Sequence, residues 1–96
     1  LKINHYTSTI TYKIMTILVT GGLGYIGSHT VLELLKNNFQ VIIVDDMSNS
    51  EKFILDNIEK VAGKRPVFFP FDLKRKELLA QVFDAYEIDG CIIFAA

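Results

Sequence analysis

Apolar residues occur in this chain as short runs that alternate with longer, mostly polar stretches. Four of these runs hold five or six residues each, are rich in β-branched and aromatic side chains, and cover residues 16–20, 40–45, 66–71 and 91–95. Short apolar runs of this length, bounded by turn-forming residues, predict buried β-strands. The prolines of the third run stand near its ends, where they interrupt strand pairing least.

The stretches between these runs carry apolar residues at helical spacing and predict three helices. The first covers residues 24–37, the second runs from an N-cap at Ser50 to a left-handed stop at Gly63, and the third covers residues 74–86. The residues expected to face the core are Val31, Leu32, Leu34 and Leu35 in the first helix, Phe53, Ile54, Ile58 and Val61 in the second, and Leu78, Leu79, Val82 and Phe83 in the third.

Regular alternation of strands and helices predicts an α/β fold with three layers, in which a parallel sheet lies between helices, because the crossovers must be right-handed. With the strands numbered along the chain, we expect the order 3-2-1-4. Ligands of such open sheets bind outside the carboxyl ends of the strands, where the order reverses. Four positions fall at those ends and are expected to meet in one crevice: Thr20-Gly21, Asp45, Asp72 and Ala95.

The segment between the first strand and the first helix contains three glycines at a spacing of three residues, Gly21, Gly24 and Gly27. In a phosphate-binding loop, Gly21 allows a sharp turn, Gly24 lets the backbone approach a pyrophosphate, and Gly27 lets the helix pack closely. The N–H groups and the positive dipole end of the helix then face the phosphates. The strand-loop-helix context predicts dinucleotide binding, and a structural domain in which the glycines serve only the turn is the alternative.

An acidic residue at the end of the second strand supports the same interpretation. Asp45 lies 18 residues beyond Gly27, close to the roughly 20-residue separation expected for an acid that holds a ribose. Its carboxylate can accept hydrogen bonds from both ribose hydroxyls and would repel a 2′-phosphate, which favours NAD over NADP. We therefore interpret residues 15–96 as the N-terminal part of an NAD-binding domain of Rossmann type, incomplete at four strands. Residues 1–14 are interpreted as a poorly ordered leader.

Composition narrows the classes of partner. The 96 residues carry a formal net charge of −1, without the basic stripe that nucleic-acid binding needs. Because no apolar run approaches the roughly 20 residues that span a bilayer, we expect neither nucleic acid nor a membrane as partner. A single cysteine, Cys91, can form no internal disulfide, which suits a reducing compartment such as the cytoplasm. We interpret Cys91 as a packing residue of a buried strand.

Several polar residues allow a structural interpretation beside a functional one. Asp72 is equally a helix-entry residue and a cofactor contact. His29 has no acid or nucleophile beside it in the sequence, so we interpret it as a surface or packing residue. Tyr25 is interpreted as packing or lining, because no lysine lies near it to make it a base. We expect no metal site, since His5 has no partner at metal-ligand spacing.

Two segments resemble a known family. Residues 20–30, Thr-Gly-Gly-Leu-Gly-Tyr-Ile-Gly-Ser-His-Thr, closely resemble the glycine segment of extended short-chain dehydrogenases/reductases, in particular the nucleotide-sugar epimerases of that family. Residues 44–50, Val-Asp-Asp-Met-Ser-Asn-Ser, resemble the ribose loop of the same epimerases, and the resemblance extends from about Met15 to the end. The cofactor contacts that it implies, glycines included, are Gly21, Gly24, Tyr25, Ile26, Gly27, Asp45, Asp46, Asn49, Ser50, Asp72, Leu73, Phe94, Ala95 and Ala96.

Three residues in the region that resembles the family depart from its pattern. Asp46 stands in place of a usual asparagine, Ile93 in place of a histidine and Ala96 in place of a glycine. The change at Ala96 adds a Cβ atom where the family's backbone passes close to the cofactor.

The resemblance implies a redox-neutral epimerisation, in which NAD⁺ takes hydride from C4 of a UDP-hexose and returns it to the other face. The family's base is a tyrosine followed four residues later by a lysine. In this chain, the residues four positions after the four tyrosines are Ile10, Thr16, His29 and Gly90, so none is a lysine. We therefore expect no catalytic residue in this chain, which resembles the N-terminal cofactor half of an enzyme that is homodimeric at full length. A nucleotide-sugar dehydratase or decarboxylase, or a non-catalytic NAD-binding fragment, is the alternative.

Overall fold

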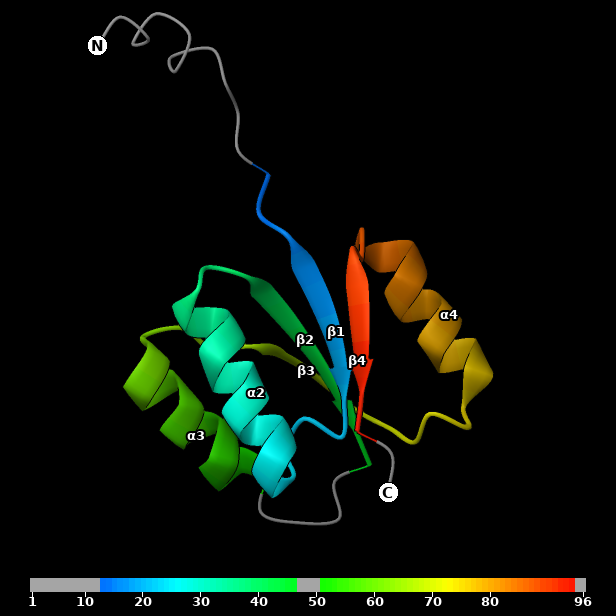
Figure 1. Cartoon of the computed structure of the whole chain (residues 1–96). Coiled ribbons are helices and arrows are strands. Elements are labelled where there is room, and N and C mark those ends of the chain that lie inside the picture. Colours follow the sequence, from blue (N-terminus) through cyan, green and yellow to red (C-terminus); the bar gives the residue numbers. More distant parts are fainter. Residues whose placement is uncertain (1–12, 47–50, 95–96) are drawn as a thin grey trace, which may run out of the picture.

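Strands and helices alternate along the chain in the computed structural model, which describes residues 13–46 and 51–94 (Figure 1). The strands are β1 (Thr16–Thr20), β2 (Gln40–Asp45), β3 (Val67–Pro70) and β4 (Gly90–Ile93). The helices are α2 (Tyr25–Lys36), α3 (Glu51–Ala62) and α4 (Lys76–Ala85). The ends of these elements lie within two residues of the predicted bounds, and the left-handed stop predicted after α3 is present at Gly63, whose φ is +76°.

The four strands form one parallel sheet in the predicted order, β3-β2-β1-β4. Leu18 of β1 pairs with Ile42 of β2 on one side and with Cys91 of β4 on the other. The central strands β1 and β2 are covered on both faces, which is why they read as nearly continuous apolar runs rather than as an alternating pattern.

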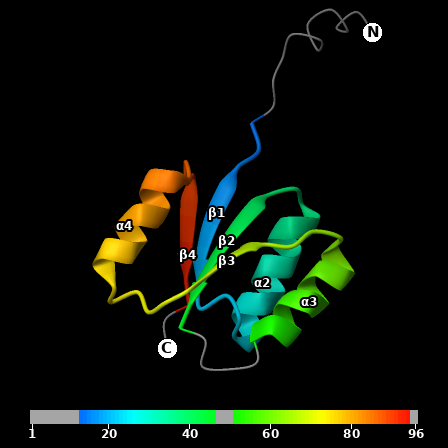
Figure 2. The same cartoon turned by 180° about the vertical axis from the view of Figure 1, so that it is seen from behind.

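Helices α2 and α3 cover one face of the sheet and α4 covers the other (Figure 2). The cluster of buried residues on the α2 and α3 side consists of Val19, Leu23, Val31, Leu35, Val41, Ile43, Leu55 and Ile58. The cluster on the α4 side consists of Leu18, Ile42, Val44 and Val82. This is the predicted three-layer arrangement, and it leaves the carboxyl ends of β1 and β4 side by side where the strand order reverses.

Helix α3 is rotated about its axis relative to the predicted orientation. Phe53 and Val61, which the periodicity predicts to face inward, are 64% and 63% exposed, whereas Leu55 is 5% exposed. The inward stripe is formed by Leu55, Ile58 and, in part, Ala62, at the helical spacing i, i+3, i+7. Apolar residues on neighbouring sides of this helix made two orientations compatible with the sequence, and packing beside α2 selects the other one.

Strand β4 lies at an edge of the sheet and is less buried than predicted. Cys91 is exposed and Ile93 is 63% exposed, so the interpretation of Cys91 as a packing residue is wrong. Both side chains project on the same face as their partners in β1, but α4 packs over β1 and β2 through Val82 and leaves this part of the face open. Phe83 of α4, predicted to face inward, is likewise 45% exposed.

The amino end of β1 is tied to its neighbours by hydrogen bonds. Asp89 Oδ2 accepts the N–H of Thr16 at 2.8 Å, and Asp89 Oδ1 accepts from the Lys13 ammonium at 2.7 Å. The hydrogen bonds from Lys13 and Thr16 lower the pKa of Asp89, and the Asp89 carboxylate raises the pKa of Lys13. On the other side, Thr16 Oγ1 donates to Gln40 Oε1 at 2.8 Å.

None of the helices in the described ranges is long and apolar enough to cross a membrane.

Candidate dinucleotide site

The glycine loop leaves β1 through a left-handed residue, as predicted. Gly21 has a φ of +70°, its N–H donates to Val44 O at 2.9 Å, and its carbonyl accepts the N–H of Gly24 at 3.2 Å. Helix α2 then begins at Tyr25 with Gly24 as its N-cap, which supplies no side chain to bond the first N–H groups of the helix. Such an end carries the partial positive charge that attracts an anion.

The three glycines of the spacing motif occupy different environments. A Cβ atom on Gly27 would meet the carbonyl oxygen of Gly21 and lie 3.0 Å from Gly22 Cα, so only glycine fits where α2 meets the loop. A Cβ atom on Gly21 would meet the carbonyl oxygen of Phe94. Gly24, by contrast, is exposed, and a Cβ atom there would have Gly21 O at 3.6 Å as its neighbour among the described residues. Gly21 and Gly27 are required by the fold, while Gly24 keeps an outer surface of the loop free of side chains.

Asp45 lies at the end of β2, against the glycine loop. Its Oδ2 accepts the backbone N–H of Leu23 at 3.2 Å, so the acid predicted from spacing and the loop predicted from glycines are in direct contact. Leu23 itself is 6% exposed and belongs to the core on the α2 side. Leu23 is not among the residues predicted from the sequence, although an apolar residue enclosed by glycines indicates that a buried side chain anchors this loop.

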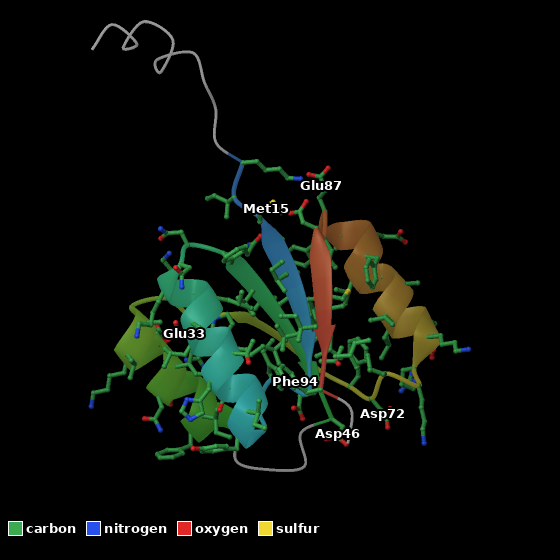
Figure 3. The ribbon with its side chains drawn as sticks, viewed as in Figure 1. Met15, Glu33, Asp46, Asp72, Glu87 and Phe94 are labelled. Carbon is green, nitrogen blue, oxygen red and sulfur yellow. The ribbon has the colours of Figure 1, made fainter. Side chains whose placement is uncertain are left out.

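The first residue after β4 completes this edge. The N–H of Phe94 donates to Thr20 O at 3.0 Å, and the Phe94 side chain packs against the core cluster on the α2 and α3 side. Figure 3 shows Phe94, Asp46 and Asp72 at one end of the sheet, whereas Met15 and Glu87 lie at the opposite end. The predicted convergence of segments at the carboxyl ends of the strands is therefore present for the residues that the structure describes.

Asp72 takes part in the turn that leads into α4. Its Oδ1 accepts the N–H of Lys74 at 2.9 Å and its carbonyl accepts the N–H of Arg75 at 2.8 Å. The bond from the Lys74 N–H to the Asp72 side chain, two residues earlier, forms an Asx-turn. Asp72 is not the N-cap of α4, because that position is held by Arg75. Leu73 beside it packs against the α4 side of the core.

The first turn of α2 presents exposed side chains at the mouth of the loop. Tyr25 is 81% exposed and Ile26 is 65% exposed, so neither is a packing residue of this part of the chain. The rings of Tyr25 and His29 meet edge to face with their centroids 4.8 Å apart. His29 is exposed, in agreement with its interpretation as a surface residue. The lining role of Tyr25 and the contact implied for Ile26 stay predictions.

Four residues that the resemblance implies as cofactor contacts lie outside the described residues: Asn49, Ser50, Ala95 and Ala96. The same holds for residues 1–12 of the predicted leader and for the N-cap predicted at Ser50.

The described residues of the loop edge fit a dinucleotide on two counts. The loop offers a glycine-lined surface at the start of a helix, which suits a pyrophosphate, and the adjacent Asp45 carboxylate suits a ribose diol. In addition, the buried hydroxyl of Thr20 at the end of β1 forms no hydrogen bond with any described group. Chemically, this arrangement can bind and orient a nucleotide.

A comparison of the sequence with protein-family models matches residues 18–96 to the family described as GDP-mannose 4,6 dehydratase. The chain belongs to this family. Its sequence is 52% identical over 80 residues to the bifunctional protein gal10 of Schizosaccharomyces pombe, a match that covers 83% of this chain and 11% of that protein. It is 48% identical over 81 residues to UDP-glucose 4-epimerase of Erwinia amylovora, covering 84% of this chain and 24% of the relative.

Solved structures of nucleotide-sugar epimerases have the same fold as this chain. The fold superimposes with a TM-score of 0.81 on UDP-glucose 4-epimerase from Bifidobacterium longum in complex with NAD⁺ and UDP, at 39% sequence identity. That match covers 85% of this chain and 24% of the solved one, so the chain spans about a quarter or less of the length of these three relatives. The resemblance to nucleotide-sugar epimerases is confirmed.

Proposed function

We propose that this chain is the NAD-binding N-terminal part of a UDP-glucose 4-epimerase. The observation that carries the proposal is the contact between the Asp45 carboxylate and the backbone of the glycine loop, at the end of a sheet that superimposes on an epimerase solved with NAD⁺. This contact holds the ribose-binding acid beside the start of α2, which is the relative position that an adenosine diphosphate needs.

In the proposed complex, the pyrophosphate lies against Gly24 and the first N–H groups of α2. Asp45 accepts hydrogen bonds from the adenosine ribose, and its negative charge excludes a 2′-phosphate. Tyr25, Ile26 and Phe94 surround the loop and limit access of water to the cofactor. The remaining contacts implied by the resemblance, Asp46, Asn49, Ser50, Asp72, Leu73, Ala95 and Ala96, complete the cofactor site in this proposal.

For the whole protein, we propose reversible epimerisation at C4 of a UDP-hexose in the cytoplasm, by a homodimer. Bound NAD⁺ supplies a hydride acceptor and donor for that reaction. This chain contributes the binding and orientation of the cofactor, whereas the tyrosine and lysine of the family's base have no counterpart in its sequence.

A second candidate function, a nucleotide-sugar 4,6-dehydratase, is favoured by the description of the matching family. The epimerase is the stronger proposal, because the relative that is 48% identical is a UDP-glucose 4-epimerase. Both candidates share the cofactor half proposed here and differ in the chemistry that follows hydride transfer, which residues outside this chain determine.

Titration of the 96-residue chain with NAD⁺ by calorimetry tests the cofactor site. We expect saturable binding that weakens by about 10- to 100-fold in Asp45→Ala, since a hydrogen bond to a charged group is worth about 1.5–3 kcal/mol. Asp45→Asn keeps an oxygen that can accept from Leu23 N–H but removes the charge, so it separates loop anchoring from ribose binding. Glu33→Ala, on the exposed side of α2, is the matched control.

Circular dichroism establishes that each variant is folded. Absence of NAD⁺ binding by the folded parent chain, or equal binding by the parent and Asp45→Ala, contradicts the proposed site. An equal loss of NAD⁺ affinity in Asp45→Ala and Glu33→Ala would show that the change in net charge causes the loss. That result would contradict a specific role for Asp45.

A further inference from the structure

The outer surface of helix α2 begins with two aromatic side chains in contact. Tyr25 is the first residue of the helix and directly follows Gly24, and His29 lies one turn later. Their rings meet edge to face, with their centroids 4.8 Å apart and an angle of 70° between the planes. Residues four apart in a helix lie on the same side, and the later side chain leans back toward the start of the helix. The imidazole of His29 therefore reaches toward the glycine loop and meets the phenol ring of Tyr25.

Little packing restrains the ring of Tyr25 apart from this contact. The backbone of Tyr25 is held in the helix, where its carbonyl oxygen accepts a hydrogen bond from Ser28 Oγ at 3.0 Å. The residue is nevertheless 81% exposed, and among the described residues its ring contact is with His29. An exposed pair of side chains on a helix contributes little to the stability of the fold. The contact instead determines where the Tyr25 ring lies.

The position of this ring matters because of what lies beside it. Tyr25 is bonded to Gly24, whose exposed surface is the one proposed for the pyrophosphate, and its side chain is the first to follow that surface along α2. An unrestrained ring on such a residue samples several staggered rotamers. Ordering a mobile side chain when a ligand binds weakens the affinity, whereas a ring that is already held avoids that loss.

We propose that His29 is a positioning residue of the dinucleotide site, which holds the ring of Tyr25 at the mouth of the glycine loop before a dinucleotide binds. This inference rests on the proposed function, in which Tyr25 shields the cofactor from water. In this role, His29 acts through the Tyr25 ring and does not itself touch the cofactor. The contact is one between two rings, so it requires an aromatic side chain at position 29 rather than a group that carries a proton.

A double-mutant cycle, measured by NAD⁺ calorimetry on the 96-residue chain, tests this role. We expect His29→Ala to raise the dissociation constant about 2- to 10-fold, because the ring must then be ordered on binding. Tyr25→Ala should raise it at least as much, since it removes the ring altogether. Adding His29→Ala to Tyr25→Ala should change nothing further, because the residue through which His29 acts is already gone. His29→Phe keeps an edge-to-face ring pair and should bind NAD⁺ with the parent's affinity.

A purely structural role of His29 would be visible as a loss of stability. Alanine is the best helix former, so the melting temperature of His29→Ala should not fall below that of the parent. Glu33→Ala is the matched control, because Glu33 is an exposed residue one turn further along the same side of α2. Its affinity for NAD⁺ should equal that of the parent.

Three results would overturn the proposal while leaving the proposed function intact. Equal affinities of the parent and His29→Ala would show that the ring contact has no effect on binding. An undiminished effect of His29→Ala in the Tyr25→Ala background would show that His29 acts without the ring. A loss of affinity in His29→Phe equal to that in His29→Ala would show that the imidazole nitrogens are needed. A folded parent chain that binds no NAD⁺ would instead overturn the proposed function together with this inference.

Discussion

At the scale of single residues, Gly24 and Gly27 belong to one sequence motif but differ in whether the fold leaves room for a side chain. Gly24 has an ordinary φ of −73° and room for a Cβ atom, whereas a side chain on Gly27 would collide with the backbone of the loop. Gly24→Val should lower the free energy of unfolding by no more than about 1 kcal/mol, the cost of a poor N-cap residue. It should abolish NAD⁺ binding, because its side chain occupies the surface proposed for the pyrophosphate. Gly27→Ala should destabilise the fold by about 1–3 kcal/mol through overpacking. Urea unfolding and NAD⁺ calorimetry on both variants check the two effects.

The outcome for Gly24→Val decides between a binding loop and a structural turn. Binding of NAD⁺ by this variant with the parent's affinity would favour the domain in which the glycines serve only the turn. Loss of stability equal to that of Gly27→Ala would contradict the open environment of Gly24.

Residue chemistry explains which parts of the site were predictable. Glycine at φ +70° and an acid at the end of a strand follow from local backbone rules, and both Gly21 and Asp45 are where the spacing predicts. The bond between Asp45 and Leu23 N–H and the unpaired hydroxyl of Thr20 depend on how two elements meet in space. Spacing along one chain carries no information about such contacts.

At the scale of elements, the same limit explains the errors in the predicted burial of α3 and β4. The period of an amphipathic helix defines an apolar side only when one side is clearly polar, and α3 has apolar residues on two neighbouring sides. The contact with α2 therefore determines which side of α3 faces the core. For β4, the apolar composition of the strand predicted a buried position, but burial of an edge strand depends on which helix covers it, and α4 covers β1 and β2 instead.

The hydrogen bonds at the amino end of β1 make the stability of this element depend on pH. Because the folded pKa of Asp89 is depressed by Lys13 and Thr16, the contribution of Asp89 is present above the ordinary carboxylate pKa of about 3.9 and is lost as pH falls through its lowered folded value. We expect Asp89→Asn to melt a few degrees below the parent at pH 7, and the difference to shrink as pH falls below 4. Thermal unfolding of both proteins from pH 7 to pH 2.5 measures this.

Asp84→Asn, an exposed position on α4, is the control for the change in net charge. A difference between the parent and Asp89→Asn that stays constant across the acid range would contradict a stabilising role of the ionised carboxylate.

At the scale of the whole molecule, the strand order was the most predictable feature. Parallel strands joined by helices allow few connections, since the crossovers have one hand and the strands must lie edge to edge. The sheet order and the two helical layers follow from that constraint together with the apolar runs. The activity is less predictable, because the chain spans 24% of the relative from Erwinia amylovora and holds no base of the family's kind.

Transfer of the matched 81 residues into the Erwinia amylovora epimerase tests whether this chain supplies a working cofactor half. The catalytic residues of such a chimera come from the relative, so its activity reports on cofactor binding and on the fit between the two parts. We expect interconversion of UDP-galactose and UDP-glucose within about tenfold of the parent enzyme, a barrier difference of about 1.4 kcal/mol. The same chimera with Gly24→Val should fold and be inactive. A folded chimera that purifies without NAD, or one whose activity is unaffected by Gly24→Val, would contradict the assignment of the glycine loop as the cofactor site of an epimerase.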